Sequence, residues 1–171
     1  MSILGSGNFV PKKVFFTSGS GSHQDRLTSF EMALRKASIE CYNLVEVSSI
    51  LPPRCRIISR QEGIKELFPG SIVFTVISRL SSNEAGSRIT SSVGMAIPKN
   101  PETEWGYFAE YHTFDETKEQ AGKYSEMIAN NMYTSISDKI PEKTMNITES
   151  AVVPENGDWT TTIAAAVFLM E

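Results

Sequence analysis

Apolar and polar residues recur along this chain with two different periods, which separate expected strands from expected helices. Residues 13–17 and 71–80 are rich in apolar and β-branched side chains, which is typical of strands buried in a sheet. Residues 88–97 are a mixed partner strand, and residues 104–114 alternate strictly between two faces. The polar residues 81–86 predict a hairpin loop between the second strand and the third.

Two longer stretches have the helical period. In the first, Thr28 and Glu31 stand three residues apart, which predicts a capping box at the start of a helix. The second covers residues 115–133, with Thr113 and Asp115 available as N-caps. Each stretch predicts one apolar stripe facing a core. The stripes comprise Leu27, Phe30, Leu34 and Ala37 in the first helix and Ala121, Tyr124, Ile128 and Met132 in the second.

The C-terminal part of the chain predicts a final hairpin. Residues 146–153 and 159–169 are its strands, and residues 154–158 contain an Asn-Gly turn signal. Residues 163–169 are apolar on both faces, which suits a central strand covered on each side. Because we find no repeat or linker, we expect residues 1–171 to form one α+β domain, with two long helices packed on mainly antiparallel sheets.

Composition and charge exclude several classes of protein. The net charge of −4 disfavours nucleic acid and anionic membranes as partners. No run reaches the roughly 18 apolar residues of a membrane span, and the N-terminus has no signal-peptide pattern, so we expect a cytoplasmic protein whose residues 1–11 are flexible. Cys41 and Cys55 form no disulfide framework and, with two histidines in the chain, no zinc site, so we expect no metal.

Residues 18–23 are a glycine–serine stretch that predicts a loop between a strand and a helix. A phosphate cradle is one interpretation, because helix N-termini present free N–H groups to anions. Gln24 stands where a dinucleotide fingerprint needs its third glycine, and no Gly-Lys-Ser/Thr follows. Nucleotide binding therefore stays a minor alternative, and a turn near an active site is the preferred interpretation.

The serine pair at Ser48 and Ser49 lies where a strand-like run, residues 42–47, ends. Pro52 and Pro53 follow, and each fixes its own φ and lacks an N–H, so the chain cannot continue as a helix. Serine is common in strand-ending turns, and for this dipeptide alone that is the ordinary explanation. The flanking sequence gives it another meaning.

Five segments in order resemble the pyruvoyl-dependent arginine decarboxylases. They are residues 29–34, 43–45, 47–53, 94–99 and 109–111, and the likeness covers most of the chain. The resemblance implies an αββα sandwich that decarboxylates L-arginine to agmatine for polyamine synthesis. Removing CO₂ from an amino acid requires a carbonyl that accepts electrons, and no lysine here stands in a convincing pyridoxal phosphate setting. We therefore expect a pyruvoyl group and no pyridoxal phosphate.

The resemblance also assigns the site residues. Self-cleavage between Ser48 and Ser49 would give chains 1–48 and 49–171 and would convert Ser49 to the pyruvoyl group. Asn43 would donate to the developing oxyanion. Glu31, on the first helix, would hold the substrate guanidinium, although the family often has Asp there.

Glu110 shares a strand face with Phe108, and the resemblance makes it the proton donor to the substrate Cα, acting in its protonated form. The family resemblance further implies a homotrimer, or a hexamer made from two trimers, with sites between subunits. A non-catalytic relative that stays unprocessed and binds arginine or agmatine is the alternative that the sequence leaves open.

Overall fold

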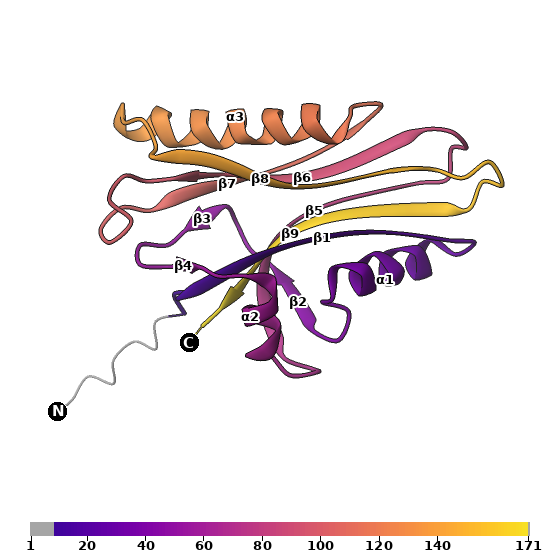
Figure 1. The fold of residues 1–171 in the computed structure, drawn as a ribbon, viewed down its shortest axis with the longest axis horizontal. Coiled ribbons are helices and arrows are strands. Elements are labelled where there is room, and N and C mark those ends of the chain that lie inside the picture. Colours follow the sequence, from indigo (N-terminus) through magenta and orange to yellow (C-terminus); the bar gives the residue numbers. More distant parts are fainter. Residues whose placement is uncertain (1–8, 171) are drawn as a thin grey trace.

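The computed structural model describes residues 9–170, which form two β-sheets and three helices. Figure 1 shows α3 (Lys118–Ser137) along the outside of one sheet and α1 (Arg26–Ala37) along the outside of the other. The prediction of a single α+β domain with two long helices is confirmed. The sequence predicted that residues 1–11 are flexible. Most of this segment, residues 1–8, lies outside the described residues, so this stays a prediction.

The larger sheet is mixed. Its neighbouring strands, in order, are β2 (Asn43–Glu46), β5 (Ile72–Ser82), β9 (Trp159–Leu169), β1 (Lys13–His23) and β4 (Arg56–Ile57). β9 pairs antiparallel with both β5 and β1, whereas the short strands β2 and β4 join the two edges in parallel. α1 and the short α2 (Arg60–Lys65) pack against this sheet through β1. No helix among the described residues is long and apolar enough to cross a membrane.

The smaller sheet is antiparallel throughout. Its strands, in order, are β3 (Ile50–Leu51), β7 (Gly106–Phe114), β6 (Arg88–Ile97) and β8 (Lys143–Val152). An apolar cluster drawn from strands of both sheets joins them, and it includes Val14, Val76, Val93, Phe108 and Phe168. The two sheets therefore share one core, with the helices on its outer sides (Figure 1).

Both expected hairpins are wrong, for the same physical reason. Residues 81–86 do not close a hairpin, because β5 and β6 belong to different sheets. The chain also changes sheet between β8 and β9. Alternation identifies a strand but does not select its partner, and two stacked sheets offer partners in either layer. β9 is nevertheless central and buried from Thr160 to Leu169, which confirms the interpretation of residues 163–169.

The expected loop at residues 18–23 is also wrong, because these residues continue β1 as far as His23, paired with β9. The glycines serve packing here: a Cβ at Gly19 would lie 2.4 Å from the carbonyl oxygen of Ala33 in α1. Only a strand without that Cβ lets the helix backbone approach so closely. Since the stretch is strand and not loop, it offers no phosphate cradle.

The first helix begins earlier than its pattern indicated. Asp25 is the N-cap and accepts a hydrogen bond from the Thr28 N–H at 2.8 Å, so the capping box predicted from Thr28 to Glu31 is wrong. Leu34 and Ala37 are buried as predicted, whereas Leu27 is 74% exposed. A stronger capping residue upstream moved the start of the helix.

The second long helix also starts at a different residue. Thr117 caps α3 in a capping box with Gln120, and Thr113 still belongs to β7, so the predicted caps are wrong. Its buried face is rotated from the predicted stripe toward small side chains, and Tyr124 is 44% exposed. The residues buried on this face include Ala121, Ser125, Ala129 and Tyr133.

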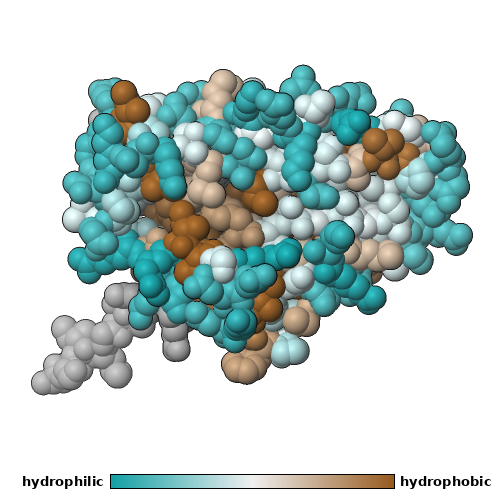
Figure 2. Space-filling view, viewed as in Figure 1, coloured by the Kyte–Doolittle hydropathy of each residue, from teal (hydrophilic) through white to brown (hydrophobic). Residues whose placement is uncertain are grey.

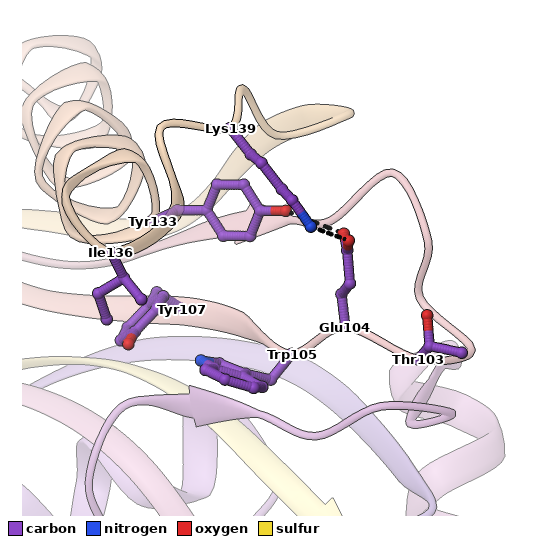
Figure 3. Close-up of a pocket in the computed structure, with 7 residues that line it drawn as sticks. All are labelled: Thr103, Glu104, Trp105, Tyr107, Tyr133, Ile136 and Lys139. Carbon is purple, nitrogen blue, oxygen red and sulfur yellow. Dashed lines mark hydrogen bonds and ion pairs between the residues drawn. The ribbon is translucent and has the colours of Figure 1, made fainter.

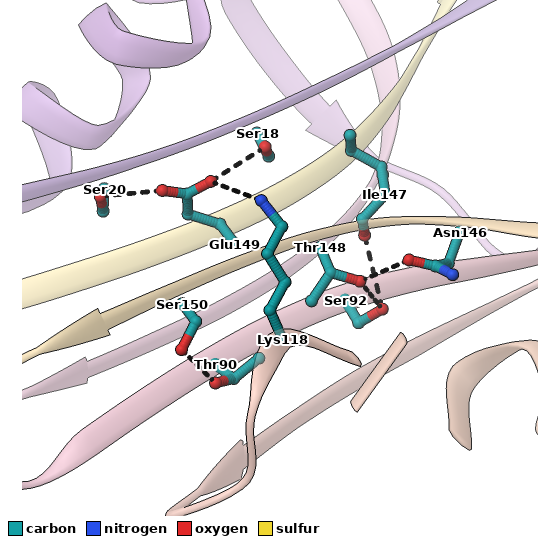
Figure 4. Close-up of polar contacts among 10 residues, drawn as sticks. All are labelled: Ser18, Ser20, Thr90, Ser92, Lys118, Asn146, Ile147, Thr148, Glu149 and Ser150. Atoms are coloured by element: carbon teal, nitrogen blue, oxygen red, sulfur yellow. Dashed lines mark hydrogen bonds and ion pairs between the residues drawn. The ribbon is translucent and has the colours of Figure 1, made fainter. Parts of the chain in front are cut away.

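One part of the core between the sheets is polar. Figure 4 shows Glu149 of β8 reaching β1, where its carboxylate accepts hydrogen bonds from Ser18 and Ser20 at 3.2 and 3.1 Å. On the same face, the Ser91 hydroxyl of β6 and the Thr162 hydroxyl of β9 pair across the two sheets at 2.8 Å. Since buried polar groups are costly unless paired, this part holds the sheets in register through specific partners. The apolar cluster lies beside β3, where the candidate site is found.

Replacing Gly94 by alanine should destabilise the fold. A Cβ there would lie 2.2 Å from the carbonyl carbon of Ser125 in α3, so helix and sheet must separate. We expect a loss of about 1–3 kcal/mol in the free energy of unfolding, measured by urea denaturation. Gly70→Ala is the control, since a Cβ at that position would have no atom within 4 Å and only the positive φ resists the change. A Gly94 variant as stable as the parent would contradict this packing.

Candidate active site

The Ser48–Ser49 peptide lies where the chain passes from one sheet to the other. Before it, the Val47 N–H donates to the Thr75 carbonyl oxygen at 2.9 Å, which continues the pairing of β2 with β5. After it, Ile50 of β3 pairs with Tyr107 of β7. The junction is therefore held at both ends by strands of different sheets, which restricts the conformations open to it.

Ser49 and Glu110, which the family resemblance assigns to one site, lie together. The Ser49 hydroxyl donates to Glu110 Oε2 at 2.9 Å, although the two residues are 61 positions apart. The Phe108 N–H donates to the Ser49 carbonyl oxygen at 2.8 Å, which fixes the backbone of the serine against β7. A carboxylate in this position can take up the proton of the serine hydroxyl.

The carbonyl of Ser48 has its own hydrogen-bond donor. The Ile50 N–H lies 3.1 Å from this oxygen, in a turn that spans only three residues. A donor at that place stabilises negative charge that develops on the oxygen when the carbonyl carbon is attacked. Sequence reasoning missed this group, because a backbone N–H has no side-chain signature; the only signal was the tight turn between a strand and two prolines.

An apolar cavity of about 460 Å³ opens beside the junction. Figure 2 shows apolar surface left of the centre of the view, over the region where Figure 1 places β3 and β7. A cavity of this size and character is typical of a small-molecule site. Its lining includes Val47, Ser48, Ile50, Phe74, Trp105 and Phe168, of which Phe74, Trp105 and Phe168 were not singled out from the sequence.

The other two predicted site residues do not join this pair within the chain. The Asn43 side-chain amide donates to the Gly70 carbonyl oxygen at 2.9 Å, at the far end of β2 from Ser49. The Glu31 carboxylate accepts from Arg35 at 3.0 Å on α1, which covers the outer face of the larger sheet. One chain therefore brings together the serine junction and Glu110, and leaves Asn43 and Glu31 elsewhere.

Among residues 9–170, no group of three or more His, Cys, Asp or Glu side chains is arranged to hold a metal ion. Both cysteines are free thiols. Burial raises the pKa of the Cys55 thiol to about 12, which makes it a poor nucleophile at neutral pH. The nucleophile that the geometry favours is thus the Ser49 hydroxyl.

Comparison with known proteins identifies the family of the chain. The family model for pyruvoyl-dependent arginine decarboxylase matches residues 13–171. The pyruvoyl-dependent arginine decarboxylase of Methanocella arvoryzae is 56% identical over 94% of this chain and 97% of its own length. A pyruvoyl-dependent arginine decarboxylase 1 of Archaeoglobus fulgidus is 51% identical, over 94% and 99% respectively. The chain therefore belongs to the pyruvoyl-dependent arginine decarboxylase family.

Proposed function

We propose that this protein cleaves its own chain between Ser48 and Ser49 and then decarboxylates L-arginine to agmatine. The observation that carries the proposal is the hydrogen bond from the Ser49 hydroxyl to Glu110, located at a serine pair in a chain of this family. The residues present fit a pyruvoyl group at position 49, because a nucleophile, a proton acceptor and an oxyanion donor surround one peptide bond.

Self-cleavage begins when Ser49 Oγ bonds to the carbonyl carbon of Ser48 and its proton passes to Glu110. The Ile50 N–H stabilises the oxyanion, and the C–N bond then breaks as the nitrogen of residue 49 takes up a proton, which leaves an ester and a free amine. Loss of the Cα proton of residue 49 then expels residues 1–48 with a free carboxylate and leaves dehydroalanine. Tautomerisation and hydrolysis by one water release ammonia, and residue 49 becomes the pyruvoyl group at the head of residues 49–171.

The pyruvoyl group supplies a carbonyl that bonds the substrate amine and accepts the electron pair left by CO₂. The proposal requires neither pyridoxal phosphate nor a metal ion, because this carbonyl fills the electron-accepting role. Glu110, already within hydrogen-bond distance of Ser49, returns a proton to the substrate Cα. The apolar cavity beside Ser48 offers a surface for a small molecule next to the reacting atoms.

The remaining residues are proposed to come from a second copy of the chain. Glu110 and Ser48 are exposed in one chain, and Glu31 and Asn43 are exposed or half-buried elsewhere on the surface. We infer a homotrimer, alone or stacked as a hexamer, in which each site takes Ser49 and Glu110 from one copy and Glu31 from its neighbour. The planar guanidinium group of the substrate then binds the Glu31 carboxylate with two parallel hydrogen bonds. In each copy the two sheets and the helices outside them form the αββα sandwich.

Co-expression of two impaired variants tests this arrangement. Glu31→Gln should weaken arginine use about tenfold or more, since it removes a charge-assisted contact, and Glu110→Gln should remove the proton donor. If the site spans two copies, mixed oligomers contain some sites with both carboxylates intact, so decarboxylase activity should partly return. The control is a mixture of the two variants purified separately and combined without subunit exchange. Mixed oligomers as inactive as either variant would contradict a shared site.

The activity itself is tested by incubating the purified protein with L-arginine and measuring agmatine by chromatography, with L-lysine as the competing cationic substrate. Agmatine formed from arginine, with no decarboxylation product formed from lysine, supports the proposal. A chain that stays unprocessed and binds arginine without releasing agmatine would instead identify a non-catalytic relative.

A further inference from the structure

A second pocket shares Trp105 with the cavity beside Ser48 and contains neither Ser49 nor Glu110. Its volume is about 120 Å³, and it lies between the start of β7 and the C-terminal end of α3. Figure 3 shows three aromatic side chains around it, Trp105, Tyr107 and Tyr133, with Ile136 beside them. The pocket thus presents aromatic rings on several sides.

A carboxylate lies at the edge of this aromatic group. The Glu104 side chain, 25% exposed, accepts a hydrogen bond from the Tyr133 hydroxyl at 3.2 Å. The Lys139 ammonium group lies 2.5 Å from the other carboxylate oxygen (Figure 3). The hydrogen bond from Lys139, and then its charge, lower the pKa of Glu104, so the carboxylate is charged at neutral pH. The Lys139 ammonium group is therefore an internal cation that already occupies the Glu104 carboxylate.

That internal cation is easily displaced. The Lys139 side chain is 56% exposed on a flexible stem, and exposed ion pairs contribute little to stability. A neighbouring cavity of about 400 Å³ shares Glu104, Tyr133 and Lys139, and it has room for the rest of a small ligand. Aromatic faces attract cations through their quadrupoles, and a carboxylate adds a charge-assisted hydrogen bond.

We propose that this pocket binds an organic cation, an ammonium or guanidinium group on a short stem, which replaces Lys139 on the Glu104 carboxylate. Agmatine and L-arginine carry the same guanidinium head, and agmatine, which lacks a carboxylate, is the probe used here. Trp105 also lines the cavity beside Ser48, and Tyr107 pairs with Ile50. The proposed cation site therefore shares Trp105 with the cavity of the proposed active site, but it uses neither Ser49, Glu110 nor Glu31.

Equilibrium dialysis with radiolabelled agmatine tests this site. The protein is the full chain carrying Ser49→Ala and Glu31→Gln, so the proposed pyruvoyl carbonyl and the proposed guanidinium partner are both absent and the result does not depend on the proposed decarboxylase function. Saturable binding is expected. Adding Lys139→Met should tighten it about tenfold by removing the competing cation, and Glu104→Gln should weaken it about tenfold.

Glu102→Gln is the matched control, since this neighbouring carboxylate is exposed and lies outside the pocket, and it should leave agmatine binding unchanged. Circular dichroism of each variant confirms that it folds. Absence of saturable binding, unchanged binding in the Glu104 variant, or weaker binding in the Lys139 variant would each overturn the proposal.

Discussion

Ser49→Ala should leave the protein as a single full-length chain that folds and makes no agmatine. The hydroxyl removed is the group that bonds to Glu110 and the proposed nucleophile, and alanine has no atom that can attack the Ser48 carbonyl. We expect complete loss of cleavage on a denaturing gel and loss of the small and large fragments from the intact mass spectrum. The thermal midpoint should change little, because one half-buried hydroxyl is lost.

Ser48→Ala is the control for this variant. It keeps the carbonyl at position 48 and the hydroxyl at position 49, so cleavage should persist. The same dipeptide occurs at residues 81–82 and 91–92, within strands β5 and β6. Fragments in the Ser49 variant would place the nucleophile elsewhere and contradict the proposed chemistry.

Glu110→Gln should slow both self-cleavage and decarboxylation by about 10²–10⁴-fold, the usual range for losing a positioned acid or base. Glutamine keeps the size of the side chain and an oxygen that accepts from Ser49, but it cannot take up the proton or return it to the substrate. Timed mass spectrometry of freshly made protein measures cleavage, and agmatine release from the fraction already cleaved measures turnover.

Glu46→Gln is the comparison for the Glu110 variant, because Glu46 is an exposed carboxylate on β2 that forms no contact with Ser49 among the described interactions. Both rates should match those of the parent. A Glu110 variant that cleaves and turns over at parental rates would remove Glu110 from both roles.

The turn at the junction could be predicted from local sequence, because the strand end, the serine pair and the two prolines are contiguous, whereas the self-cleavage chemistry came from the family resemblance. The prediction that Ser49 and Glu110 share one site came from the family resemblance, because the two residues are far apart in the chain. The Ile50 N–H could not be found in this way, because its role depends on the turn and not on the identity of its side chain.

The strand pairing was the part of the fold that the sequence did not determine. The consecutive strands β5 and β6 were predicted to form a hairpin. Instead β5 pairs with β9 in the larger sheet, and β6 pairs with β7 and β8 in the smaller one. The glycines of β1 looked like a loop because glycine is common in turns, whereas α1 requires them to be small. In both cases the local pattern favoured one structure, and packing against the rest of the fold selected another.

The intact mass of the purified protein tests the central claim most directly. We expect two chains: residues 1–48 ending in a free carboxylate, and residues 49–171 lighter by one ammonia than the same chain beginning with serine. A protein that converts arginine to agmatine while its Ser48–Ser49 peptide bond remains unbroken would contradict the account.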